Sequence, residues 1–296
     1  MLRALAFSLI CVPAAYAAEH VRLRHALDQP MTLQLERLAA EYNAAQDEFE
    51  VEFMRVRRAP AKSVRLALPL NTARPVLYYN RDAFRRAKLN PSKAPKTWYE
   101  MAGTLGSLAA SGQSCAYTTA WPAWVMLENS GGTLSRQLMV RWTSMLATWE
   151  KAGFFSYSGP ANEAEARFAS GECAVLTASS ASRRALARQV HFNLGVAPLP
   201  YYADSDVVSR ALPASAPAVW VERQSVGVTN FLAFLAAHAA QAYREREILE
   251  EELEAVWRGG KSAPDALEAY ECRSALTGTK KVISGSDTVC KSESVR

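Results

Sequence analysis

Apolar and polar residues alternate in two short segments near the start of the chain. Val21 and Leu23 flank Arg22, and residues 49–53 alternate Phe, Val and Phe with two glutamates. A period of two is typical of strands buried on one face. Between these segments, apolar residues recur at spacings of three and four, at Met31, Leu35, Leu38 and Tyr42. The pattern predicts a β-α-β unit, whose strands would be parallel and joined by a right-handed crossover.

Strand and helix patterns continue to alternate through the rest of the chain. Short apolar runs predict further strands at 75–80, 115–119, 173–177, 194–197 and 218–221. Helical spacing and end signals predict helices at 82–88, 97–110, 138–149, 164–169, 180–189, 226–243 and 248–257. Thr97 and Glu100 form a Thr-x-x-Glu capping box at the start of one of these helices. The alternation predicts an α/β fold throughout.

The first residues have the order of a secretory signal peptide. Arg3 precedes the apolar stretch 4–12, and Ala15-Tyr16-Ala17 supplies the small residues of a cleavage site. A buried N-terminal helix is the alternative, but Pro13 would break it. We therefore expect a signal peptide at residues 1–17, a mature protein beginning near Ala18, and a periplasmic location.

Composition and charge exclude several classes of protein. The chain has 296 residues, of which 49% are hydrophobic and 21% charged, so it can bury a substantial core. Its formal net charge of +5 suits small anionic molecules but is too small and dispersed to indicate nucleic-acid binding. No apolar run after the N-terminus reaches the roughly 18 residues that span a bilayer.

The common catalytic and metal-binding motifs are absent from the sequence. It lacks a nucleophile elbow, a phosphate-binding P-loop, a dinucleotide fingerprint and a His-Glu-x-x-His helix. The four histidines are far apart and suggest neither a catalytic triad nor a metal site: His20, His25, His191 and His238. We therefore expect no enzymatic activity.

Two cysteines stand at the start of predicted buried strands. Cys115 and Cys173 each open an apolar run, and an oxidising compartment permits pairing. A disulfide between them and a pair of buried free thiols are both consistent with this pattern.

Several blocks resemble the family of extracellular solute-binding proteins that serve ABC importers. The blocks are Arg74–Pro91 with Pro95–Trp98, Cys115–Asn129, Gly171–Ser180, Phe192–Tyr201 and Glu251–Ser262. The resemblance covers most of the chain before about residue 273. It implies a two-lobed periplasmic-binding-protein-like fold with a ligand cleft at a hinge, acting as a monomer without a cofactor. The implied partners are a small anionic polyol phosphate, such as sn-glycerol-3-phosphate or a glycerophosphodiester, and the membrane subunits of an ABC permease.

The resemblance also divides the chain into lobes. The first lobe would comprise residues 18–74 with 220–247, and the second 75–219 with 248–273. Residues 274–296 are rich in Ser, Thr, Lys and Gly and are predicted to form a poorly ordered tail.

The implied ligand residues are Trp121, Trp124 and Ser179. The two tryptophans follow a strand end and could line one wall with flat rings, although filling the core is the alternative. Ser179 and Ser180 lie between a strand and a helix, where hydroxyl and backbone N–H groups suit a phosphate. Simple capping of the helix is the alternative for these serines.

The first lobe is predicted to be incomplete. Two blocks of the family pattern are absent, between about Val56 and Leu66 and between about Tyr243 and Ile248, on the order of a hundred residues together. They would carry an acidic, a tyrosine and an arginine ligand residue. An internally deleted remnant that no longer binds ligand is therefore the main alternative function, and a secreted enzyme with an unrecognised site is a distant one.

Overall fold

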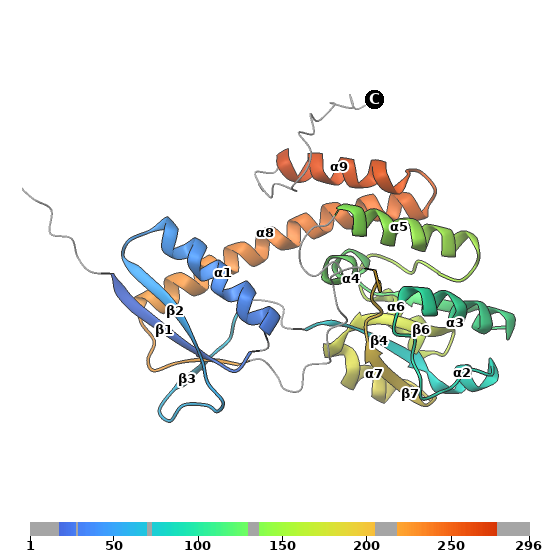
Figure 1. Cartoon of the computed structure of the whole chain (residues 1–296), viewed down its shortest axis with the longest axis horizontal. Coiled ribbons are helices and arrows are strands. Elements are labelled where there is room, and N and C mark those ends of the chain that lie inside the picture. Colours follow the sequence, from blue (N-terminus) through green and yellow to red (C-terminus); the bar gives the residue numbers. More distant parts are fainter. Residues whose placement is uncertain (1–17, 28, 70–72, 130–135, 205–217, 277–296) are drawn as a thin grey trace, which may run out of the picture. The chain divides into compact units, whose positions relative to one another are not determined.

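A computed structural model describes residues 18–27, 29–69, 73–129, 136–204 and 218–276. The chain divides into two compact units, one formed by residues 1–72 and 215–239 and the other by residues 73–214 and 240–296. Figure 1 shows the elements of both units. The lobe boundaries expected from the sequence, at 74/75, 219/220 and 247/248, lie close to these divisions but do not coincide with them.

The first unit is built on a four-stranded sheet with strand order β2-β1-β8-β3. Its strands are β1 (Glu19–His25), β2 (Phe49–Arg55), β3 (Val64–Leu66) and β8 (Val219–Val221). The strands β1 and β2 are parallel, as expected, and helix α1 (Gln29–Ala45) connects them. Strand β8 pairs antiparallel with both β1 and β3. The core of this unit includes Leu23, Leu35, Phe231 and Leu235.

The second unit contains a four-stranded sheet with order β5-β6-β4-β7. Its strands are β4 (Pro75–Asn80), β5 (Cys115–Thr119), β6 (Cys173–Ser179) and β7 (Leu194–Pro198). The pair β5 and β6 is parallel, whereas β4 runs antiparallel to both β6 and β7. Alternate residues of β4 belong to different cores: Leu77 and Tyr79 to one, Val76 and Tyr78 to the other. Both faces of the sheet are therefore buried.

The helices of the second unit follow local signals in the sequence. They are α2 (Arg81–Arg86), α3 (Trp98–Ala110), α4 (Pro122–Asn129), α5 (Arg136–Lys151), α6 (Glu163–Ala169), α7 (Arg183–Gln189) and α9 (Ala263–Leu276). At the start of α3, the Glu100 N–H donates to Thr97 Oγ1 at 3.1 Å, as the capping box predicts. The Glu100 side chain accepts from the Lys96 N–H rather than from the Thr97 N–H.

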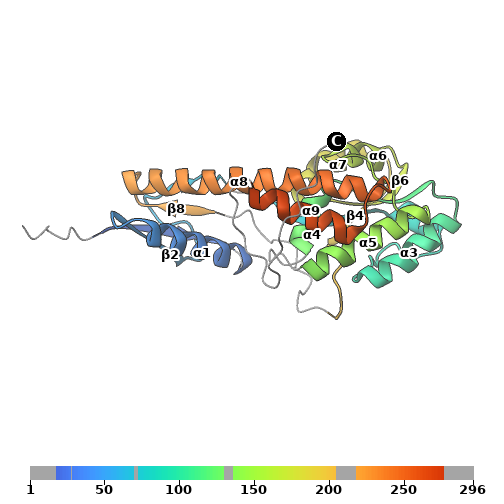
Figure 2. The same cartoon turned by 90° about the horizontal axis from the view of Figure 1, so that it is seen from above.

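Two expectations for the C-terminal part of the chain are wrong. The helices expected at 226–243 and 248–257 form one continuous helix, α8 (Val226–Trp257), which Figure 2 shows without a break. Residues 243–248 read Tyr-Arg-Glu-Arg-Glu-Ile and contain no Gly or Pro to end a helix. The expected tail does not begin at Ser274, because α9 continues to Leu276 and Ser274 is buried. The rest of that expected tail lies outside the described residues.

In the described part of the chain, no helix has both the length and the apolar character needed to cross a membrane.

Cys115 and Cys173 form a disulfide, so the pairing alternative is confirmed. The two residues are direct partners in the parallel register of β5 and β6, and their Cα atoms are 4.4 Å apart. The bond joins two fully buried cysteines on neighbouring strands and closes a segment with a sequence separation of 58 residues.

Replacing both cysteines by alanine should lower the free energy of unfolding of the second unit by about 4 kcal/mol, because the unfolded chain regains the entropy of the opened loop. Urea unfolding followed by tryptophan fluorescence would measure this, since only Trp220 among the tryptophans lies in the first unit. Ser114→Ala, which alters an exposed neighbour of Cys115, is the control and should change little. An equally small change for the double variant would contradict the prediction.

Candidate functional site

Three strands of the second sheet have an end at the same edge of that sheet: β4 begins there, and β5 and β6 finish there. The strands β5 and β6 are parallel, with Thr119 opposite Thr177, so both finish at this edge. Strand β4 runs the other way, and its first residue, Pro75, is opposite Ser179. The sheet therefore brings Trp121 and Ser179 to the same edge. In α/β sheets, ligands commonly bind outside the carboxyl ends of strands.

Trp121 occupies the turn between β5 and α4 in an unusual backbone conformation. Its φ of 53° lies in the left-handed region, which a tryptophan rarely adopts. The Trp121 N–H donates to the Ala161 carbonyl at 2.8 Å, and its carbonyl accepts from the Val125 N–H at 3.0 Å. These bonds hold the strained turn and leave the side chain half-buried.

Trp124 has a different environment from Trp121. It lies within α4, is only 8% exposed, and belongs to the main core of the second unit. Its contacts correspond to the core-filling alternative. Of the two rings, Trp121 has the greater exposed surface, and a ligand role for Trp124 stays a prediction.

Ser179 and Ser180 are both engaged with neighbouring backbone. Ser179 Oγ accepts from the Ala181 N–H at 3.2 Å, so it caps the 3₁₀ turn η1 (Ser180–Ser182). Ser180 Oγ accepts from the Arg74 N–H at 3.1 Å, and the Ser180 N–H donates to the Arg74 carbonyl at 2.7 Å. The α-helix itself begins only at Arg183. The expectation of serines directly at an α-helix N-terminus is therefore wrong, because a separate 3₁₀ turn intervenes.

A cation that the sequence did not identify lies against Trp121. The guanidinium carbon of Arg246, on α8, is 5.2 Å from the centre of the Trp121 ring and 4.8 Å from that of Tyr243. Such contacts between a cation and an aromatic face are attractive. Tyr243 and Arg246 are three residues apart on one helix, but nothing local in the sequence connects them with Trp121.

A buried carboxyl, Glu250, lies one turn further along α8. It is 7% exposed, and its Oε1 accepts from the Ala123 N–H in the first turn of α4 at 2.9 Å. Its Oε2 has no hydrogen-bond partner among the residues that the structure describes. Burial raises the pKa of Glu250 to about 8, while the Ala123 N–H and the Arg246 charge act to lower it. The group is therefore mainly protonated in the folded protein at neutral pH.

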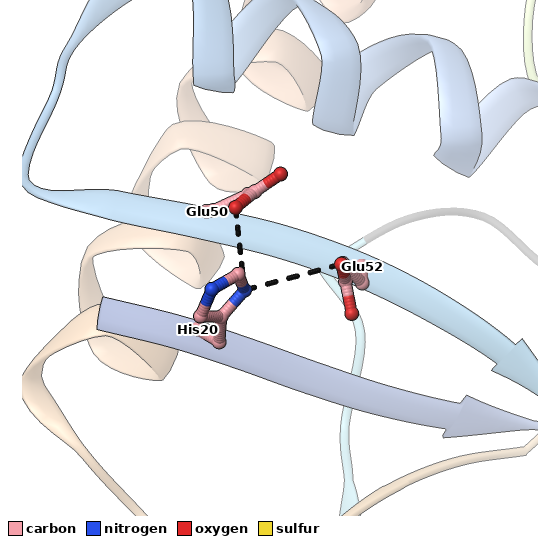
Figure 3. A group of neighbouring side chains, drawn as sticks. All are labelled: His20, Glu50 and Glu52. Atoms are coloured by element: carbon pink, nitrogen blue, oxygen red, sulfur yellow. Dashed lines mark ion pairs between the residues drawn. The ribbon is translucent and has the colours of Figure 1, made fainter. Parts of the chain in front are cut away.

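One group of side chains has the composition of a metal site. His20 Nδ1 is 3.2 Å from Glu50 Oε2 and 3.9 Å from Glu52 Oε1, across the strands β1 and β2 (Figure 3). All three residues are exposed, and Arg22 Nε lies 3.7 Å from the other oxygen of Glu52. As they stand, these contacts form a ladder of surface ion pairs between strands.

The chain belongs to the family described as bacterial extracellular solute-binding protein, whose model matches residues 14–242. The sn-glycerol-3-phosphate-binding periplasmic protein UgpB of Yersinia enterocolitica is 35% identical over 195 residues, covering 57% of this chain and 44% of that protein. UgpB of Escherichia coli K12 is 35% identical over 196 residues, or 58% and 45% of the two chains. The matches therefore span less than half the length of these relatives.

A solved structure also resembles the fold of this chain. The GacH receptor of Streptomyces glaucescens has a TM-score of 0.50 at 12% identity, and the match covers 89% of this chain and 100% of that one. At this identity the likeness concerns the fold alone. It agrees with the mixed α/β architecture.

Glu250→Gln should remove a pH dependence of stability in the second unit. The carboxyl ionises near pH 4.5 in the unfolded chain but near 8 in the folded protein, so stability falls as pH rises between these values. Glutamine keeps an oxygen for the Ala123 N–H and cannot ionise. We expect the variant to melt at least about 3 °C above wild type at pH 8, with little difference near pH 4.5.

Glu247→Gln removes an exposed carboxylate from the same helix and is the matched control. Melting curves from pH 4.5 to 8.5 should show the wild-type slope for this control. A Glu250→Gln variant that follows the same slope would show that Glu250 is ionised in the folded protein.

Proposed function

We propose that this chain is a periplasmic binding component of an ABC importer. It captures a small anionic polyol phosphate, sn-glycerol-3-phosphate or a glycerophosphodiester, and presents it to the membrane permease. The observation that carries the proposal is that Trp121 and Ser179 follow strands at the same edge of a sheet, with Arg246 against the Trp121 ring, in a member of this family. The names of the similar curated proteins support the substrate class.

Each group at this edge suits one part of such a ligand. The Trp121 ring offers a flat apolar face to the C–H side of a glycerol unit. The Ser179 hydroxyl can donate to a phosphate oxygen while its second lone pair continues to accept from Ala181. Arg246 supplies a permanently charged donor set that matches phosphate geometry. None of these roles requires a cofactor or covalent chemistry.

A deleted, non-binding remnant is the competing function. It rests on the match to only 44% of UgpB from Yersinia enterocolitica and on the two blocks of the family pattern that the sequence analysis predicts to be absent. At the position of the first block, β2 ends at Arg55 and β3 begins at Val64. At the position of the second, α8 continues without interruption, and Arg246 lies within it. Arg246 therefore lies within the segment 243–248, where the second block is predicted to be absent.

Trp121→Ala should weaken binding of glycerol-3-phosphate about ten- to a hundredfold, because it removes an aromatic platform worth about 1–3 kcal/mol. Ser179→Ala should cost less, about 1–1.5 kcal/mol. Trp124→Ala should also weaken binding if the family assignment holds, but it opens a cavity and should lower stability as well. Isothermal titration calorimetry and thermal unfolding of each variant separate the two effects.

Tyr99→Ala is the control, because Tyr99 is an aromatic residue of the same unit that is 90% exposed on α3. Binding unchanged in both tryptophan variants would refute the site. A wild-type protein that gives no heat with glycerol-3-phosphate or glycerophosphocholine would establish the remnant.

Export should produce a mature chain that begins at Ala18, because Ala15-Tyr16-Ala17 presents small residues at the two positions that signal peptidase reads. Intact-mass measurement of the protein from a periplasmic extract checks this. A chain that retains Met1 and remains in the cytosolic fraction would refute the location.

A further inference from the structure

Removal of the signal peptide would create a new chain end with unusual chemistry. Cleavage after Ala17 leaves Ala18-Glu19-His20 as the first three residues. We propose that this amino terminus binds Cu²⁺ through the Ala18 amine, the backbone nitrogens of Glu19 and His20, and His20 Nδ1. The proposal rests on the proposed export and cleavage, but not on the binding of any polyol phosphate.

The four nitrogens match the coordination that Cu²⁺ prefers. A histidine at the third position lets amine, two amides and imidazole close fused chelate rings around one ion in a plane. Tetragonal nitrogen ligation is typical of Cu²⁺, which also stands highest among the divalent first-row metals in affinity. The protonated amine and the two amide N–H groups each lose one proton on binding, so three protons are released. Zn²⁺ has no preference for such a plane and favours tetrahedral sites.

The structure leaves these residues accessible. The His20 side chain is 53% exposed, and Nδ1 is the ring nitrogen that faces the two glutamates in Figure 3. The Glu19 N–H donates to the Glu48 carbonyl at 2.9 Å, and this bond at the end of the β1–β2 ladder must open. Val21 and Leu23 are buried in the core and hold the rest of β1 in place. Metal binding therefore requires only the first residues of β1, Glu19 and His20, to leave the sheet.

The charges around this terminus attract a divalent cation. Glu19, Asp47, Glu48, Glu50 and Glu52 are all exposed at this end of β1 and β2. Arg22 offsets part of the charge of Glu52. Glu50 lies 3.2 Å from His20 Nδ1 while β1 is paired with β2. The carboxylates thus attract the ion electrostatically, while the four nitrogens are its ligands.

The test uses untagged protein whose first residue is Ala18, with its mass verified, titrated with CuCl₂. We expect one tightly held ion per chain, with the visible absorption and electron paramagnetic resonance of a planar four-nitrogen complex. A glycine added before Ala18 moves the histidine to the fourth position and should abolish that spectrum. His20→Ala should abolish it too. His238→Ala, which changes a histidine on α8, should leave it intact.

A double variant, Glu50→Gln with Glu52→Gln, distinguishes copper binding by the amino-terminal nitrogens from copper binding by the side chains of His20, Glu50 and Glu52. The four-nitrogen spectrum should persist in this double variant. Copper binding that survives the added glycine but is lost in the double variant would overturn the proposal in favour of His20, Glu50 and Glu52 as the ligands. Equal competition by ZnCl₂ would overturn it as well. The mass of the exported chain tests cleavage separately, so failed export and failed copper binding are distinguishable.

Discussion

The central position of β4 is the constraint on which the second unit depends. All six of its residues are buried, and it pairs antiparallel with β6 on one side and β7 on the other. Because β5 is parallel to β6, the start of β4 and the ends of β5 and β6 must lie at the same edge. Just inside that edge, the Tyr117 hydroxyl lies 2.8 Å from Thr177 Oγ1, which donates to Thr119 Oγ1 at 2.7 Å. This buried network of hydroxyl groups rigidifies the ends of β5 and β6 next to the candidate site.

Helix α8 places two ionisable side chains, Arg246 and Glu250, against the residues of this edge. Its Arg246 lies against Trp121, and its Glu250 anchors the first turn of α4 through the Ala123 N–H. A protonated Glu250 can accept that bond without placing a negative charge near Arg246. The guanidinium is then not opposed by this carboxyl when an anion approaches.

The sequence predicted those features that depend on local patterns. Strand 75–80 was recognisable because it is apolar on both faces, and the start of α3 because Thr97 and Glu100 form a capping box. Features set by tertiary contacts were missed. Arg246 meets Trp121 only after folding brings α8 to α4, and the three-residue strand β3 is too short to show a period. The unbroken course of α8 was missed because charged residues at 243–248 interrupt its apolar stripe without ending the helix.

The position of β8 has a consequence for the order of folding. This three-residue strand is the sole partner of β3 among the described strands and the second partner of β1. The chain reaches it only after residue 198, where the sheet of the second unit is already complete. The sheet that begins at the amino terminus therefore receives its last strand only after all four strands of the other sheet have been synthesised. Until then the edge of β1 and the strand β3 remain unpaired, and such edges invite association with other chains.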